Sequence, residues 1–180
     1  NNANAFNSTQ RSPRKSSLKN IFNSSRAFWV LPFLKEVIDL TIQIDKMTLI
    51  DLENIKDILI ADFDDFWTYN VLKDELNCNN SYYIVAKTLD NEIVGFAGIK
   101  SVLDESDIMN IVVKKSFRNQ GIGSLLLKEL INVAISLNST SITLEVMDEN
   151  FSAIHLYEKF GFEKIGIRKN YYKDKNGIIM

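Results

Sequence analysis

The chain has 180 residues, of which 46% are hydrophobic and 24% charged, and its formal net charge is −2. A chain of this length can bury one good core, and a charge this small excludes a global basic field that would attract nucleic acid or an anionic membrane. The single cysteine, Cys78, and the single histidine, His155, exclude an internal disulfide and a metal site built from several such ligands. We therefore expect a protein of a reducing compartment, with no metal, no membrane span and no direct nucleic-acid partner.

The first forty residues differ in composition from the rest. Residues 1–25 are rich in Asn and Ser and contain no acid, and the first acid in the chain is Glu36. Such a segment cannot bury enough apolar surface to offset the entropy lost on ordering. We expect a flexible or loosely docked extension over residues 1–40 and one domain over 41–180. The extension has the composition of an organellar transit peptide, and it fits equally an added segment without function, in which case the protein is cytoplasmic.

Alternating β-rich and helical patterns follow the extension. Strands are indicated by apolar runs or by apolar and polar residues in alternation, and helices by apolar residues three or four apart. Asp90 and Asn91 supply a hairpin turn between two of the strands. In chain order we expect a strand at 42–47, helices at 51–59 and 71–76, strands at 82–89, 92–99 and 108–113, a helix at 124–137, a strand at 142–146, a helix at 152–160 and a strand at 162–168. This order predicts an α/β (α+β) domain with a mixed central sheet flanked by helices.

A glycine-rich turn, Arg118-Asn119-Gln120-Gly121-Ile122-Gly123, lies between an apolar strand and an amphipathic helix. Glycine lacks the Cβ atom that would keep a ligand from the backbone, and a helix start offers unpaired N–H groups and a positive dipole end. Both features suit a phosphate group, although the same pattern also fits a plain strand-to-helix turn. The turn has neither the Gly-Lys-Ser/Thr of a Walker A loop nor the spacing of the dinucleotide fingerprint.

Three motifs in chain order resemble those of the GNAT superfamily of acetyltransferases. The first is Arg-x-x-Gly-x-Gly after the strand Ile111-Val112-Val113. The second is Leu144-Glu145-Val146 followed by Asn150, and the third is the run of residues 153–162, AIHLYEKFGF. The resemblance covers roughly residues 44–180 and is greatest to the ribosomal-protein-alanine N-acetyltransferases (the RimI type). It implies a GNAT fold and acetyl-CoA as co-substrate.

The resemblance also assigns residues to acetyl-CoA. The backbone of the strand would pair with the pantetheine amides, an N–H near Val113 would hold the developing oxyanion, and the glycine turn would hold the pyrophosphate, with Arg118 able to add a charge. Asn150 would hydrogen-bond the cofactor or only cap the following helix. The complete set is Ile111, Val112, Val113, Arg118, Asn119, Gln120, Gly121, Ile122, Gly123, Ser124 and Asn150.

Two residues are candidates for proton transfer. An α-amine with a pKa of about 8 is mostly protonated at neutral pH and must lose a proton before it attacks a thioester. The resemblance assigns Glu145 as the general base and Tyr157 as the general acid that protonates the departing thiolate. The alternatives are an exposed strand residue for Glu145 and a core aromatic for Tyr157. We interpret His155 as a packing or surface residue.

The acceptor implied by the resemblance is the N-terminal amine of a protein, with a ribosomal protein as candidate partner. Trp67, Tyr171 and Tyr172 are the aromatic residues expected to bind it. Met147 departs from the arginine that many relatives carry after Leu-Glu-Val. Two alternatives remain: a small-molecule amine acetyltransferase, which a closed pocket would favour, and a non-catalytic acyl-CoA-binding or scaffold protein.

Overall fold

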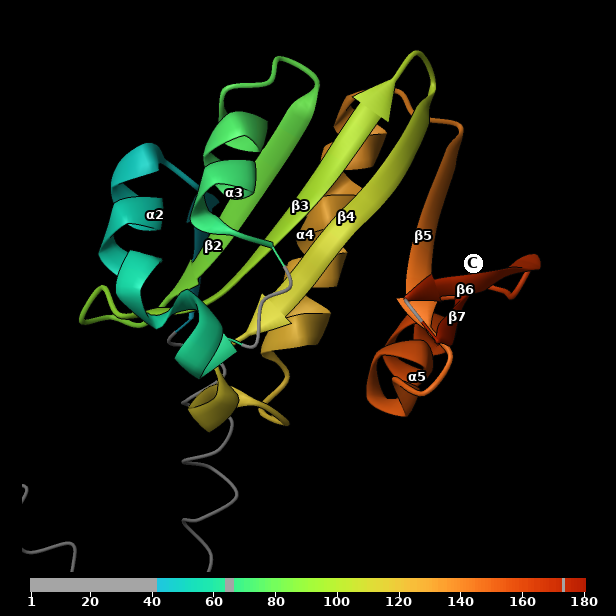
Figure 1. The fold of residues 1–180 in the computed structure, drawn as a ribbon. Helices are drawn as coiled ribbons and strands as arrows, with labels where there is room; N and C mark the ends of the chain where they lie inside the picture. Colours follow the sequence, from blue (N-terminus) through green and yellow to red (C-terminus); the bar gives the residue numbers. More distant parts are fainter. Residues whose placement is uncertain (1–41, 64–66, 173) are drawn as a thin grey trace, which may run out of the picture. The chain divides into compact units, whose positions relative to one another are not determined.

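The computed structural model describes residues 42–63, 67–172 and 174–180, so the expected boundary at residue 40 lies outside the described residues. In chain order the elements are β1 (Gln43–Lys46), α2 (Leu49–Ile55), the 3-10 turn η3 (Lys56–Ile58), the π turn η4 (Leu59–Phe63), α3 (Tyr69–Leu76), β2 (Ser81–Lys87), β3 (Ile93–Val102), β4 (Glu105–Val113), the 3-10 turn η5 (Lys115–Phe117), α4 (Ile122–Ser136), β5 (Ser141–Met147), α5 (Phe151–Lys159), β6 (Gly166–Tyr172) and β7 (Lys175–Ile179) (Figure 1). None of these helices has the length and apolarity needed to cross a membrane.

The strands form one mixed sheet. Within the described residues it has seven strands in the order β1-β2-β3-β4-β5-β7-β6. The pairing is antiparallel throughout except between β4 and β5, which run parallel. The long α4 connects these two strands, as a parallel crossover requires. The predicted α/β domain with a mixed sheet flanked by helices is confirmed.

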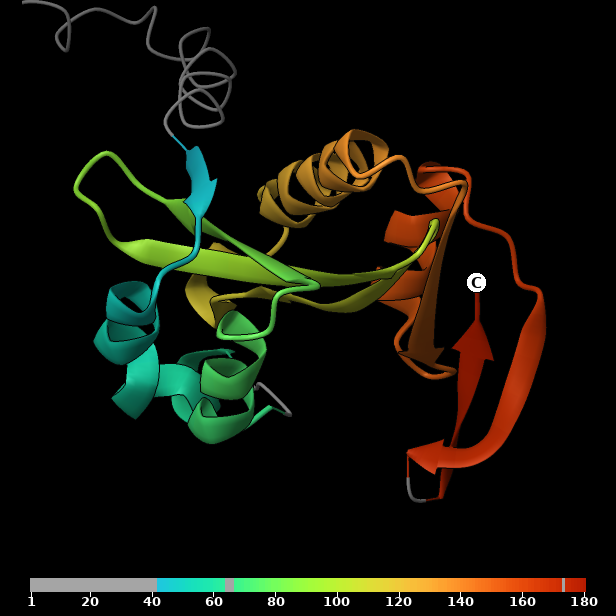
Figure 2. The ribbon, with the colours of Figure 1, turned by 90° about the horizontal axis from the view of Figure 1, so that it is seen from above.

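Helices cover both faces of the sheet. Seen from above, α4 lies on one side of the central strands and α2 and α3 lie on the other (Figure 2). Leu126, Leu127 and Leu130 of α4 are fully buried in the core of the first face. On the second face Leu52 of α2 and Leu72 of α3 are fully buried against β2 and β3. The apolar spacing that predicted the helices therefore marks the sides that pack on the sheet.

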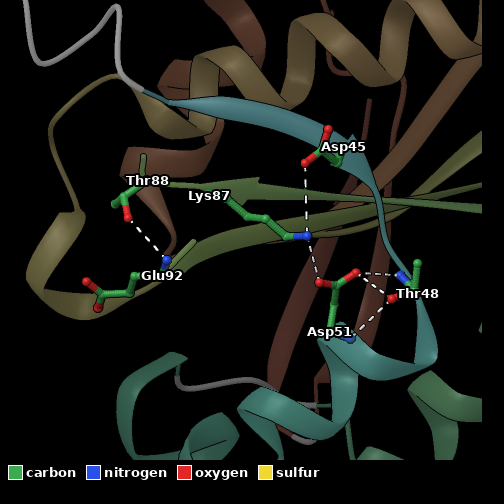
Figure 3. A network of polar contacts seen from close by, with 6 residues as sticks. All are labelled: Asp45, Thr48, Asp51, Lys87, Thr88 and Glu92. Atoms are coloured by element: carbon green, nitrogen blue, oxygen red, sulfur yellow. Dashed lines mark hydrogen bonds and ion pairs between the residues drawn. The ribbon is translucent and has the colours of Figure 1, made fainter. Parts of the chain in front are cut away.

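The start of α2 is tied to β2 through a buried carboxylate (Figure 3). Thr48 and Asp51 form a capping box, in which the Asp51 amide donates to Thr48 Oγ1 and the Thr48 amide donates to Asp51 Oδ2 at 2.8 Å. Lys87 Nζ lies 2.7 Å from Asp51 Oδ1. Burial alone would raise the pKa of the Asp51 carboxyl, but hydrogen bonds from Lys87 and Thr48 outweigh it and hold that pKa below its ordinary value.

Replacing Asp51 by Ala is expected to lower the free energy of unfolding by about 2 kcal/mol, because the substitution removes a cap and leaves Lys87 without its nearest anion. Urea unfolding at neutral pH measures the loss, and Asp57→Ala, at an exposed acid of η3, is the matched control. Since the pKa is lowered in the folded state, this stabilisation is present above the ordinary value of 3.8 and is lost as the pH falls through the folded-state pKa. A difference between wild type and variant that stays constant into strong acid would contradict this account.

Most expected elements form, with three differences. The helix expected at 51–59 begins at Leu49 and continues as η3 and η4 beyond Ile55. The strand expected at 162–168 forms later, as β6, because Phe162 packs its ring against Tyr157 with centroids 6.0 Å apart instead of entering the sheet. The strand β7 was not expected at all.

Candidate active site

The site is built where β4 and β5 separate. Their parallel pairing ends at Ile108 and Leu144, although both strands continue beyond this point. At the same place the register between β3 and β4 shifts, so that Met109 forms a bulge between residues paired to Gly98 and Ile99. Figure 1 shows the two strands diverging toward their C-terminal ends. The backbone edge of residues 109–113 that faces β5 therefore has no strand partner within the described chain.

A cleft of about 480 Å³ lies on the α4 and α5 side of this separation. We call it the β4–α5 cleft. It brings together the end of β4, the glycine turn and the start of α5. Its walls are formed by Phe63, Ile111, Val112, Val113, Phe117, Arg118, Asn119, Gly121, Ile122, Gly123, Ser124, Asn150, Ser152, Ala153, Leu156 and Tyr157. Ten of the eleven residues expected at the cofactor are thus in this wall; the exception is Gln120, whose Nε2 donates to the Ser116 carbonyl at 3.2 Å.

The glycine turn presents the start of α4 to the cleft. Asn119 and Gly121 have φ angles of 61° and 87°, a left-handed conformation that glycine adopts without a steric penalty. Gly121 is the N-cap of α4, and no side chain caps the helix. The first N–H groups of α4 are therefore available to an anion in the cleft, with the positive end of the helix dipole behind them.

Two of the residues expected at the cofactor and found in this wall use their side chains within the protein. Arg118 donates from Nε to the Val113 carbonyl at 3.1 Å and from Nη2 to the Phe63 carbonyl at 3.2 Å. Asn150 is the N-cap of α5, and its Oδ1 accepts from the Ala153 amide at 3.2 Å. The capping role considered for Asn150 is therefore present in the structure.

A second cavity of about 840 Å³, which we call the β5–β6 pocket, lies toward α3 and β6. It gathers residues from four separate segments of the chain. They are Trp67, Thr68 and Val71 around the start of α3, Asp107, Ile108 and Met109 of β4, Thr143, Leu144 and Glu145 of β5, and Arg168, Tyr171, Tyr172 and Ile179 of the β6–β7 hairpin. All three aromatic residues expected to bind the acceptor line this pocket.

Glu145 is half-buried in the β5–β6 pocket. Its Oε1 lies 2.9 Å from Arg168 Nη2, whereas its Oε2 is buried without a hydrogen-bond partner among the described residues. A hydrogen bond to this carboxylate raises the pKa of Tyr171, and the Tyr172 hydroxyl donates to the Glu145 carbonyl at 3.2 Å. A buried carboxylate oxygen without a donor is costly, so this atom is suited to accept a proton or a hydrogen bond from a bound molecule.

Tyr157 is buried in the wall of the β4–α5 cleft, on the other side of the separation between β4 and β5. Burial, with a smaller contribution from Tyr172, raises its pKa to about 12. The phenol is therefore protonated at neutral pH and has a proton to donate. His155 and Cys78 are both exposed and line neither cavity.

Comparison with known proteins agrees with this geometry. Residues 52–162 match the model of the acetyltransferase (GNAT) family. The chain belongs to the GNAT family. It is 38% identical over 112 residues to the [ribosomal protein bS18]-alanine N-acetyltransferase of Haemophilus influenzae, covering 62% of this chain and 74% of that one.

Solved structures show the same fold. The ribosomal-protein-S18-alanine N-acetyltransferase of Escherichia coli superposes with a TM-score of 0.70 at 29% identity, covering 77% of this chain and 91% of that one. A GNAT acetyltransferase of Elizabethkingia anophelis with acetyl-CoA bound gives a TM-score of 0.63 at 25% identity, covering 77% and 95%. The chain is an acetyl-CoA-dependent N-acetyltransferase of the GNAT type, as its motifs predicted.

Some residues of this GNAT site were not expected from the sequence. Phe63 lines the β4–α5 cleft, and Arg168 and Asp107 line the β5–β6 pocket. Arg168 lies three and four positions before Tyr171 and Tyr172 and could have been noticed as a cation near two tyrosines. Phe63 and Asp107 gave no signal, because their places depend on how η4 and β4 pack.

Proposed function

We propose that the chain acetylates the N-terminal α-amine of a protein, with the N-terminal alanine of ribosomal protein bS18 as the candidate substrate and the cytoplasm as the candidate setting. The observation that carries the proposal is the position of Glu145 and Tyr157 on the two sides of the β4–β5 separation, each lining a different cavity. A base on the acceptor side and an acid on the thioester side are the two groups that acetyl transfer to an amine requires.

Acetyl-CoA fits the β4–α5 cleft by three features. The unpaired edge of residues 109–113 offers N–H and C=O groups to the amides of pantetheine, as a neighbouring strand would. The uncapped start of α4 offers N–H groups to the pyrophosphate. The backbone N–H near Val113 would hold the oxyanion that develops on the thioester carbonyl.

The β5–β6 pocket would hold the amine. Glu145 takes a proton from the bound ammonium at Oε2, directly or through a water, while Arg168 holds Oε1. The free amine then forms a bond to the thioester carbon, the carbon–sulfur bond breaks, and Tyr157 gives its proton to the departing thiolate. The nitrogen of the new amide loses its second proton to solvent, the proton on Glu145 also leaves to solvent, and Tyr157 takes one proton back, so the reaction releases one proton and the enzyme ends as it began.

A peptide acceptor is supported by the walls of the pocket. Tyr171 is 46% exposed, and the Arg168 side chain is 54% exposed, so a chain that enters from the β6 side can continue into solvent. A small amine would need a more closed site. The names of the relatives above also indicate an N-terminal alanine.

A panel of acceptors tests the proposal against its two alternatives. We expect release of free CoA from acetyl-CoA with peptides that begin with Ala, Ser, Met or Gly, and much less with spermidine or free lysine. Turnover on the small amines alone would move the assignment to a small-molecule acetyltransferase. Tight binding of acetyl-CoA without turnover on any acceptor would support the non-catalytic scaffold.

A further inference from the structure

Three basic residues, two just before the glycine turn and one at its first position, all contact η4. Lys115 Nζ donates to the Ala61 carbonyl at 2.7 Å, and Arg118 Nη2 donates to the Phe63 carbonyl at 3.2 Å. Lys114 Nζ lies 3.5 Å from the Asp62 carboxylate and 2.8 Å from that of Glu92 on the β3 side. These residues lie next to the turn that is expected to bind phosphate, yet their side-chain nitrogen atoms contact oxygen atoms of the protein.

The position of η4 explains why cations gather there. Among the described residues this π turn closes the helical run that begins with α2, and its Ala61 and Phe63 carbonyls accept from Lys115 and Arg118. Cations are favourable at a helix C-terminus because the dipole is negative at that end. Arg118 also donates to the Val113 carbonyl at 3.1 Å, so one guanidinium joins the end of η4 to the end of β4.

The segment held in this way contributes to the site. Phe63 is 1% exposed; its ring packs at a tilt against that of Phe96, with centroids 5.6 Å apart, and it lines the β4–α5 cleft with Val112 and Val113. The next described residue, Trp67, lines the β5–β6 pocket. A displacement of η4 from β4 would therefore alter the cleft wall next to the backbone that holds the thioester.

We propose that Lys115 and Arg118 are positioning residues that clamp η4 to the end of β4, fixing Phe63 in the cleft wall, and that their side chains do not bind the phosphates of the cofactor. Lys114 supports the clamp through Asp62. The proposal rests on the proposed function in that the cleft takes acetyl-CoA. The backbone N–H groups at the start of α4 bind the phosphates instead.

The first test follows η4 itself and needs no turnover. In Arg118→Gln and in Lys115→Gln we expect amide hydrogen exchange in residues 59–63 of the full chain to become roughly tenfold faster, the effect of losing one charged hydrogen bond. Lys46→Gln removes the same charge from exposed β1, at the far edge of the sheet, and should leave this exchange unchanged. Unchanged exchange in both clamp variants would overturn the proposal.

The second test separates a clamp from a phosphate ligand. Acetyl-pantetheine carries the thioester without the pyrophosphate. We expect Arg118→Gln to lower kcat/KM by the same factor, about tenfold, with acetyl-CoA and with acetyl-pantetheine. We expect Arg118→Lys to show the same loss, because an ammonium cannot reach both carbonyls as the guanidinium fork does.

If Arg118→Gln lowered kcat/KM with acetyl-CoA but not with acetyl-pantetheine, and Arg118→Lys kept the wild-type value, Arg118 would be a phosphate ligand. That result would overturn the clamp. Absence of transfer by the wild-type chain from either donor would count against the proposed function alone. The hydrogen-exchange measurement on residues 59–63 would then test the clamp without any measurement of activity.

Discussion

Replacing Glu145 by Gln is expected to lower kcat for acetylation of an Ala-initiated peptide by a factor of about 100 to 1000, because the substitution removes the proposed base but keeps the shape of the side chain. The carboxylate lies in the β5–β6 pocket. Its Oε1 is paired with Arg168, and its Oε2 has no hydrogen-bond partner among the described residues. The side-chain amide of the Gln variant occupies the same place but is a poor proton acceptor. Steady-state kinetics at neutral pH measures the change, with KM expected to vary much less than kcat.

Glu149→Gln is the matched control for this substitution. Glu149 lies just after β5, is paired with Lys175 at 2.6 Å and has a side chain that is 57% exposed. The same chemical change there should leave kcat within about twofold, as for surface substitutions in general. If Glu145→Gln kept more than a third of the wild-type kcat, Glu145 would not be the base.

Replacing Tyr157 by Phe is expected to lower kcat by about 100-fold, because the substitution removes the proposed proton donor to the departing thiolate. Burial raises the pKa of this phenol to about 12, so the group stays protonated across the range in which the enzyme can be assayed. The kcat profile of the wild-type protein should therefore show no loss of activity assignable to Tyr157 below about pH 11. Transfer followed from pH 6 to about pH 10 in both proteins tests this expectation.

Tyr69→Phe removes a hydroxyl of the same kind from a site that does not line either cavity. Tyr69 donates to Glu53 at 2.6 Å on the exposed side of α3, and its loss should not change kcat. A thermal unfolding curve for Tyr157→Phe shows whether the buried ring still packs. A folded Tyr157→Phe protein with wild-type kcat would assign the proton donor elsewhere, to solvent or to another side chain.

The fold was largely predictable because its helices are amphipathic and its central strands are apolar. Leu126, Leu127 and Leu130 repeat at helical spacing, and they are among the residues buried in α4. The strand β7 could not be predicted in this way. It contains Asn176 and the buried Gly177, where an added Cβ would lie 3.2 Å from the Tyr171 ring. A glycine is favoured at position 177 because Tyr171 of β6 packs closely against it, and the local sequence pattern does not predict that contact.

The candidate site was predictable where backbone and motif decide it, and less so where side chains from distant segments meet. Gly121 was expected at a ligand-binding turn, and its left-handed conformation at the start of α4 agrees with that role. Arg118 was expected to add a charge for phosphate, but its guanidinium contacts the Phe63 carbonyl, 55 positions earlier in the chain. No local pattern shows that η4 ends beside β4, so neither this contact nor the place of Phe63 was accessible from the sequence.

The most direct test of the central claim is the position of the transferred acetyl group. A peptide that begins with Ala and carries an internal lysine is incubated with acetyl-CoA and the wild-type chain, and the product is fragmented in a mass spectrometer. We expect one acetyl group on the α-amine of the alanine, and no product when that amine is blocked in advance. An acetyl group on the lysine, or an unchanged peptide under conditions in which spermidine is acetylated, would contradict the assignment as an N-terminal acetyltransferase.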